Sequence, residues 1–280
     1  GGGIALELDG EIATGDHETS ERWLLDLSQP TEAPRLVAAR ETGVRYGVHD
    51  RGDTLYILTN QGDAIDFRIA VAPLATPGRD HWQPLVPHRP GVYIVAVLLQ
   101  AGHLVRLERA NALPSIVVRD LADGSEHVIA FDEQAYSLDI SRGFEFDTTV
   151  LRFSYSSMTT PAEVYDYDMA TRRRTLRKRQ QIPSGHDPAD YVTTRILAPA
   201  ADGAQVPVSI LHRRGQALDG SAPLLLYGYG SYGMAMPAAF AANRLSLVDR
   251  GVVYAIAHIR GGSDKGWGWY LDGKRLAKTN

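Results

Sequence analysis

A repeat of about 48 residues is the sequence feature that most constrains the fold of this chain. Three stretches share one layout, in which two β-rich runs separated by a turn are followed by a third run. Equivalent apolar positions of successive repeats are 47 to 49 residues apart: Leu55, Leu104 and Leu151 in the first run, and Ile69, Val117 and Val164 in the second. Four-stranded propeller blades repeat at about 40–50 residues. The period therefore predicts a β-propeller in preference to a β-sandwich, in which such regular spacing would arise only by chance.

The strands of these repeats are short, rich in β-branched and aromatic residues, and separated by turn dipeptides such as Gln61-Gly62 and Asp123-Gly124. Residues 22–27 and 35–39, which precede the first repeat, have the pattern of the outer strands of an earlier blade. About three and a half blades are thus predicted, whereas a propeller closes as a ring of about four to eight. We therefore expect an incomplete ring and a chain that is part of a longer protein.

Composition excludes several classes of protein. Of the 280 residues, 44% are hydrophobic and 22% are charged, which is typical of a globular protein. No cysteine is present, so disulfides, a thiol nucleophile and Cys-ligated metals are excluded. The net charge of −4 gives no support for nucleic-acid binding. The longest apolar run, residues 92–99, is far shorter than the ~20 residues of a membrane span. No nucleic acid, membrane, metal or cofactor is expected as a partner.

A dense basic run covers residues 172–179. Such a run can act as a nuclear signal or an anion-binding patch. It is equally typical of an outer blade strand, where charges keep the edge solvated and prevent pairing with another chain. We favour the outer-strand interpretation.

The strand pattern changes at residues 182–188, which have the composition of a linker, and we place a domain boundary between residues 184 and 185. Residues 1–184 are assigned to the propeller and residues 185–280 to a second domain. The second domain begins with a predicted hairpin (residues 191–212), a continuous apolar strand of the buried type (223–227) and a Gly-rich loop (228–233). A helix (240–250), a second buried strand (252–257) and a second Gly-rich loop (260–263) follow. Alternation of strands and helix indicates an α/β domain.

The first Gly-rich loop has two interpretations. Its glycines match the dinucleotide-binding pattern, which requires an acidic residue at the end of the next strand and a helix that begins at once. The next strand instead ends at His258-Ile259-Arg260, and residues 234–237 lie where the helix should begin. The alternative is an α/β-hydrolase loop that supplies an oxyanion-hole donor, for which the hydroxyl of Tyr229 is suited. A packed loop aromatic is the structural alternative for Tyr229.

Taken together, the motifs resemble the prolyl oligopeptidase family of serine peptidases, and its oligopeptidase B branch in particular. The motifs that carry the resemblance follow one another in the same order as in the family: residues 156–161, 227–233, 245–251, 260–262 and 269–274. The family has a seven-bladed propeller inserted into an α/β-hydrolase domain. The resemblance therefore implies the last blades of the propeller followed by the first part of the catalytic domain.

The resemblance also implies the site. In this family the second tyrosine of the Tyr-Gly-Tyr-Gly loop, here Tyr229, donates its hydroxyl to the oxyanion, and a Ser-His-Asp triad supplies the nucleophile. Neither Ser231 nor Ser263 has the Gly-x-Ser-x-Gly spacing of a nucleophile elbow. We therefore expect the nucleophile, base and acid to lie beyond these 280 residues, which by themselves should be inactive. His258 is interpreted as a polar residue at a strand end, and His186 as structural.

One departure from the family concerns the second Gly-rich loop. Relatives usually have a glycine and then a glutamate after Arg-Gly-Gly, whereas this chain has Ser263 and Asp264. The shorter acid is expected to change the contacts of the loop without changing the class of protein.

By resemblance, the expected function is that of a cytosolic serine oligopeptidase that cleaves short peptides after Arg or Lys, with a periplasmic location left open. A non-catalytic propeller that binds a partner, and an NADP-binding α/β protein, are the alternatives.

Overall fold

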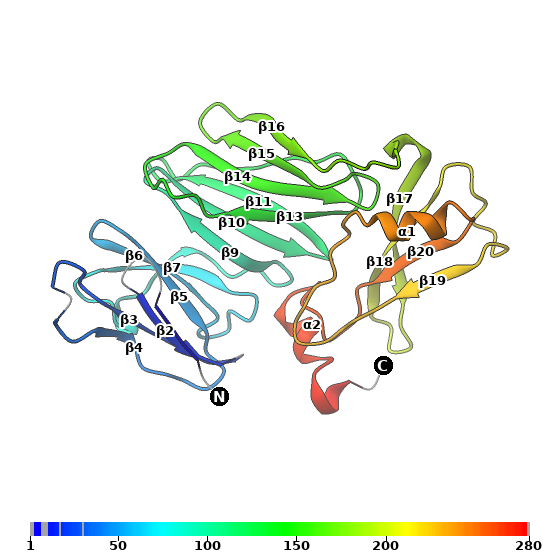
Figure 1. Ribbon diagram of the computed structural model, residues 1–280. Helices are drawn as coiled ribbons and strands as arrows, with labels where there is room; N and C mark the ends of the chain where they lie inside the picture. Colours follow the sequence, from blue (N-terminus) through cyan, green and yellow to red (C-terminus); the bar gives the residue numbers. More distant parts are fainter. Residues whose placement is uncertain (1–2, 7–10, 17, 30, 279–280) are drawn as a thin grey trace. The chain divides into compact units, whose positions relative to one another are not determined.

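The computed structural model describes residues 3–6, 11–16, 18–29 and 31–278, and it divides into two compact units, residues 1–90 and 91–280 (Figure 1). The first unit contains two four-stranded antiparallel sheets, each with its strands in sequence order. Their strands are β1 (Gly3–Leu6), β2 (Glu11–Gly15), β3 (Ser20–Leu24) and β4 (Arg35–Ala38), then β5 (Tyr46–Arg51), β6 (Thr54–Thr59), β7 (Arg68–Pro73) and β8 (Gln83–Val86). A short 3₁₀ helix, Arg79–His81, precedes β8.

Two further four-stranded antiparallel sheets open the second unit. Their strands are β9 (Tyr93–Leu99), β10 (His103–Ala110), β11 (Leu113–Asp120) and β12 (Glu126–Val128), then β13 (Tyr136–Ser141), β14 (Val150–Ser157), β15 (Glu163–Asp168) and β16 (Arg173–Arg179). The three predicted runs of each repeat are therefore the second, third and fourth strands of a sheet. The estimate of three and a half blades was low, because only β3 and β4 of the first sheet were recognised and β1 and β2 were not.

Within each unit, the two blades share an apolar core. In the first unit, Leu55 and Ile57 of β6 are fully buried against Val37 of β4. In the second unit, Val105 of β10 and Phe153 of β14 belong to one cluster that joins the two sheets. Such burial of β-branched and aromatic side chains is the main stabilising contribution to these sheets.

The basic run forms β16, the last strand of its sheet, and all seven of its residues are exposed. Arg179 pairs with Glu163 of β15 at 2.6 Å, and Arg177 lies 3.3 Å from Asp166 of the same strand. The interpretation of this run as a solvated outer blade strand is confirmed.

A mixed sheet of order β17-β18-β20-β19 completes the second unit. The hairpin of β17 (Tyr191–Pro199) and β18 (Gln205–Arg213) follows a 3₁₀ helix, Pro188–Asp190, and β18 is antiparallel to β20 (Val253–Ala257). Strand β19 (Leu224–Tyr227) is parallel to β20. Helix α1 (Ala242–Val248) lies against β18 and β20 (Figure 1), helix α2 (Trp267–Leu271) follows β20, and a 3₁₀ helix covers Arg275–Ala277.

Burial of β19 differs from the prediction. The run was expected to be a buried strand, yet its four side chains are 42–59% exposed. It is the edge strand of the sheet, and no described residue pairs with its second edge. By contrast, Val253 to Ile256 of β20 are buried, as predicted.

The linker places His186 against the last blade. One ring nitrogen of His186, Nε2, lies 2.6 Å from the carbonyl oxygen of Thr159, and its ring stacks on Tyr191. These contacts agree with a structural role for His186. The two compact units divide after residue 90, and residues 91–280 form one unit that includes the predicted linker. No helix in the described part of the chain is long and apolar enough to cross a membrane.

Candidate active site

The loop after β19, residues 228–233 (the Tyr229 loop), presents tyrosine side chains to solvent. Tyr229 is 38% exposed, and its hydroxyl makes no hydrogen bond with any residue that the structure describes. Tyr232 is 71% exposed and adopts a positive φ of 56°. The Tyr229 side chain is thus partly covered by the protein and partly open to solvent.

The backbone of the Tyr229 loop is fixed by close contact with the loop after β20, residues 260–264 (the Ser263 loop). Gly261 has a φ of +94°, and a Cβ there would lie 2.0 Å from the Gly230 carbonyl oxygen. Gly230 has a φ of +58°, and its Cβ would lie 2.6 Å from the Arg260 carbonyl oxygen. The Gly233 amide donates to the Gly261 carbonyl oxygen at 2.9 Å. Only glycine permits both the backbone conformation and this approach.

The Ser263 loop is itself buried and held on the side of α2. Trp269 donates its indole N–H to the His258 carbonyl oxygen at 3.0 Å, and its own carbonyl oxygen accepts from the Gly261 amide at 3.0 Å. Arg260 and Lys265 lie over the Trp269 ring, 5.1 and 4.6 Å from its centroid. Arg260 also pairs with Asp202 in the turn between β17 and β18. These contacts make the loop a rigid support.

Behind the loop lies a buried chain of hydrogen bonds from Ser209 through His258 to Asp264. Ser209 Oγ is 2.9 Å from His258 Nε2, and His258 Nδ1 is 2.9 Å from Asp264 Oδ1. The carboxylate accepts from Nδ1, which leaves Nε2 free to accept from the Ser209 hydroxyl in the neutral imidazole. The order Ser-His-Asp imitates a catalytic triad.

This arrangement is nevertheless structural. Ser209 lies in the middle of β18, and the three residues are only 1–2% exposed, so a peptide carbonyl has no access to the hydroxyl. A nucleophilic serine, by contrast, sits on an exposed turn. His258 is thus a polar residue at a strand end, as interpreted from sequence, and its partners Ser209 and Asp264 were not foreseen.

Ser263 has contacts of its own. Its hydroxyl donates to the Gly233 carbonyl oxygen at 2.6 Å and accepts from Arg109 Nη1 at 3.2 Å. The Asp264 carbonyl oxygen accepts from the Ala112 amide at 2.6 Å. Arg109 is the second-last residue of β10 and Ala112 lies in the turn to β11, so a blade hairpin reaches the Ser263 loop. Ser263 and Asp264 therefore join this loop both to the Tyr229 loop and to a blade hairpin.

The dinucleotide interpretation of the Tyr229 loop finds no support. Helix α1 begins only at Ala242, and a helix N-terminus is what would bind a pyrophosphate. The strand end that should carry an acid carries His258, which is turned into the buried network. In the described residues, no group of three or more His, Asp or Glu side chains is arranged to hold a metal ion.

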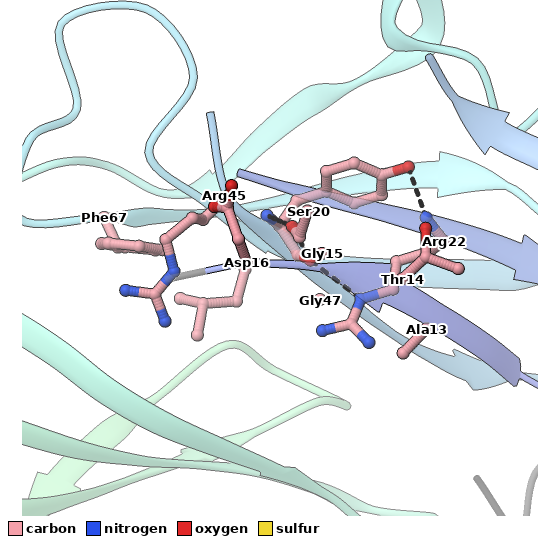
Figure 2. Close-up of a pocket in the computed structure, with 11 residues that line it drawn as sticks. Ala13, Thr14, Gly15, Asp16, Ser20, Arg22, Arg45, Gly47 and Phe67 are labelled. Atoms are coloured by element: carbon pink, nitrogen blue, oxygen red, sulfur yellow. Dashed lines mark hydrogen bonds between the residues drawn. The ribbon is translucent and has the colours of Figure 1, made fainter. Parts of the chain in front are cut away.

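A pocket of about 420 Å³ lies in the first unit (Figure 2). It is lined by Ala13, Thr14, Gly15, Asp16, Ser20, Arg22, Arg45, Tyr46, Gly47, Leu58 and Phe67. Its polar groups bond to one another: Ser20 Oγ donates to the Tyr46 carbonyl oxygen at 2.9 Å, and Arg22 Nε donates to the same oxygen at 3.0 Å. The lining contains no histidine that could act as a general base.

Comparison with known proteins identifies the family. The model of the prolyl oligopeptidase N-terminal β-propeller domain matches residues 11–180, and that of the prolyl oligopeptidase family matches residues 238–280. The chain belongs to the prolyl oligopeptidase family. The resemblance drawn from the motifs is confirmed, as is the fold class of a β-propeller followed by an α/β-hydrolase domain.

Among curated members of the prolyl oligopeptidase family, the chain is 45% identical to dipeptidyl aminopeptidase BI of Pseudoxanthomonas mexicana, over 88% of this chain and 34% of that protein. It is 31% identical to protease 2 of Moraxella lacunata, over 96% of this chain and 38% of that protein. The chain thus spans little more than a third of the length of these relatives.

Solved structures of the prolyl oligopeptidase family have the same fold as this chain. Oligopeptidase B from Trypanosoma brucei, in a closed form with covalently bound antipain, superposes with a TM-score of 0.89 at 34% identity, covering 97% of this chain and 40% of that one. Oligopeptidase B from Leishmania major gives a TM-score of 0.88 at 32% identity, with the same coverage.

Proposed function

We propose that the whole protein is a serine oligopeptidase that cleaves short peptides after Arg or Lys, with Tyr229 as an oxyanion-hole donor. The observation that carries the proposal is the partly exposed Tyr229 side chain, whose hydroxyl bonds to no described residue, on a backbone that glycine contacts hold in place. Likeness to two oligopeptidase B structures and to protease 2 supports the substrate class. The proposal keeps the domain boundary at residues 184/185, a cytosolic location and no cofactor.

In this mechanism a nucleophilic serine attacks the peptide carbonyl and forms an acyl-enzyme through a tetrahedral intermediate. The Tyr229 hydroxyl donates a hydrogen bond to the negative oxygen that develops. A donor already held in place requires no reorganisation during the reaction, which is why such groups contribute strongly to rate. The proposal places the nucleophile, base and acid outside the 280 residues, in which no Gly-x-Ser-x-Gly motif occurs.

A fluorophosphonate probe tests the serine mechanism. Treatment of the full-length protein should label one serine, and mapping of the labelled peptide should place it outside residues 1–280. Labelling of Ser209, Ser231 or Ser263 would overturn this account of the nucleophile.

Substrate class is tested with N-terminally blocked fluorogenic peptides that differ only in the residue before the scissile bond. Arg and Lys should exceed Pro and Ala by at least about tenfold in kcat/KM, because an unpaired charged pocket discriminates against apolar side chains. Equal rates for all four would refute the Arg/Lys preference and leave the serine mechanism standing.

A dipeptidyl aminopeptidase is the second candidate, and the 45% identity with dipeptidyl aminopeptidase BI favours it. An enzyme of that class requires a free N-terminus and releases dipeptides. The comparison is direct: one peptide is offered with its N-terminus free and again with it blocked. Cleavage of the blocked peptide supports the oligopeptidase, whereas cleavage of the free peptide alone supports the aminopeptidase.

A further inference from the structure

The turn between β10 and β11 is unusual in its backbone. Ala110 and Leu113 are paired across the hairpin, and the two residues between them, Asn111 and Ala112, both have positive φ, at 48° and 62°. This is the two-residue turn of a tight hairpin, in which glycine or asparagine is usual. An alanine there is strained by its Cβ. The Ala112 amide donates to the Asp264 carbonyl oxygen at 2.6 Å, so the strained turn is docked against the Ser263 loop.

Arg109, one residue before the end of β10, faces the same loop. Its Nη1 donates to Ser263 Oγ at 3.2 Å. Burial lowers the pKa of the Arg109 guanidinium, and the negative charge of Asp264 opposes that shift. A guanidinium withdrawn from water in this way requires specific partners. The hydroxyl of Ser263 and the charge of Asp264 provide them.

The Ser263 hydroxyl connects Arg109 to the Tyr229 loop. The hydroxyl accepts from Arg109 and donates its own proton to the Gly233 carbonyl oxygen at 2.6 Å, four residues after Tyr229. A glycine or alanine at this position would have no hydroxyl with which to make either bond. The connection from blade to loop therefore depends on the Ser263 hydroxyl.

We propose that Arg109 and Ser263 are positioning residues for Tyr229: the blade hairpin holds the Tyr229 loop, through the Ser263 hydroxyl, in the geometry that directs the Tyr229 hydroxyl at the oxyanion. The inference rests on the proposed role of Tyr229. Neither residue touches the substrate; both act through the loop.

A double-mutant cycle in the full-length protein tests the proposal. Arg109→Gln and Ser263→Ala should each lower kcat about tenfold with KM little changed, because a small displacement of a catalytic donor reduces the rate strongly. In a Tyr229→Phe background, where no hydroxyl remains to be positioned, the same substitutions should lower kcat less than about twofold. Arg119→Gln, a blade arginine that pairs with Glu126, is the matched control and should leave kcat unchanged.

Hydrogen exchange provides a readout that does not depend on catalysis. The amides of residues 228–234 should exchange several-fold faster in Arg109→Gln and Ser263→Ala, and at the parental rate in Arg119→Gln. Ser263→Gly is a second variant that removes the hydroxyl, and it should reproduce the effects of Ser263→Ala.

The outcomes separate the two proposals. If Tyr229→Phe lowers kcat and the Arg109 and Ser263 variants change neither kcat nor exchange, the positioning role is overturned and the function stands. If the losses are equal in both Tyr229 backgrounds, the residues act on something other than Tyr229 and the inference is again overturned. If the Arg109 and Ser263 variants exchange faster in the loop but Tyr229→Phe leaves kcat unchanged, then these residues hold the Tyr229 loop in place and the proposed oxyanion role of Tyr229 fails.

Discussion

The two Gly-rich loops follow neighbouring parallel strands of one sheet, yet they have opposite environments. The Tyr229 loop is largely exposed, and its two tyrosine side chains face solvent. In the Ser263 loop, residues 261–264 are buried and bonded to His258, to α2 and to a blade hairpin. Under the proposed function the two loops have separate tasks: the Tyr229 loop presents the donor hydroxyl, and the Ser263 loop supplies the rigidity that an exposed loop cannot provide for itself.

The sharpest test of this division is a matched pair of glycine substitutions. Gly261→Ala introduces a Cβ 2.0 Å from the Gly230 carbonyl oxygen at a φ of +94°, so we expect a loss of about 4 kcal/mol or more in the free energy of unfolding. Gly228→Ala places its Cβ 3.4 Å from Ile259 Cδ1, an ordinary contact, and should cost about 1 kcal/mol or less. Denaturant unfolding of both variants measures the contrast; equal losses would remove the distinction between a supporting and a supported loop.

The tyrosines of the exposed loop form the second pair. Tyr229→Phe should lower kcat about 100-fold, equivalent to about 2.7 kcal/mol in the activation barrier, because one oxyanion donor is lost. Tyr232→Phe removes the same atom from a more exposed side chain and should leave kcat within about twofold. Steady-state cleavage of a blocked Arg peptide distinguishes them, and an unchanged rate in Tyr229→Phe would refute its role as donor.

Substitution of Asp264 tests whether the buried hydrogen-bond network stabilises the Ser263 loop. Asp264→Asn removes the charge that faces Arg109 and weakens the bond to His258, so we expect a loss of about 2 kcal/mol in the free energy of unfolding. Asp202→Asn, on the exposed pair with Arg260, should destabilise less, because surface ion pairs contribute little. The comparison is made by thermal unfolding at neutral pH, and the reverse ranking would show that the buried network is not what holds the Ser263 loop.

Sequence patterns predicted the propeller because its second and third strands are apolar, β-branched and regularly spaced. They failed for strands such as β5 and β13, whose sequences mix polar and apolar residues and contain no apolar run. The exposure of β19 was also missed, because an apolar composition shows only that a strand can be buried and not what lies beside it.

The candidate site was only partly accessible from sequence. The motif around Tyr229 identified the exposed loop, since its residues are contiguous. The Ser209–His258–Asp264 network could not be found in this way, because the pairing of β18 with β20 brings Ser209 to a histidine 49 residues further along the chain. The contact of Arg109 with Ser263 spans 154 residues in sequence. It depends on the turn at Asn111 and Ala112, which have positive φ although neither residue is a glycine that would have indicated such a turn.

The smallest expected effect lies in a blade, away from both loops. Hydrogen bonds from Arg106, and then from Arg119, lower the pKa of Glu126 to about 2. A folded-state pKa below the unfolded value of 4.5 stabilises the fold above about pH 4.5, and that contribution is lost as the pH falls toward about 2. Because the Glu126 side chain is 34% exposed, solvent screening reduces the contribution to about 1 kcal/mol.

Glu126→Gln should therefore be less stable than the parent by about 1 kcal/mol at pH 7, and the two should converge as the pH approaches 2. Denaturant unfolding between pH 7 and pH 2 measures the gap. Peptide cleavage at neutral pH should be unchanged, because Glu126 bonds to Arg106 and Arg119 and to neither loop. A gap that persists at pH 2 would attribute the stabilisation to packing, and a loss of activity at pH 7 would show that the loops respond to blade contacts other than the Arg109 hairpin.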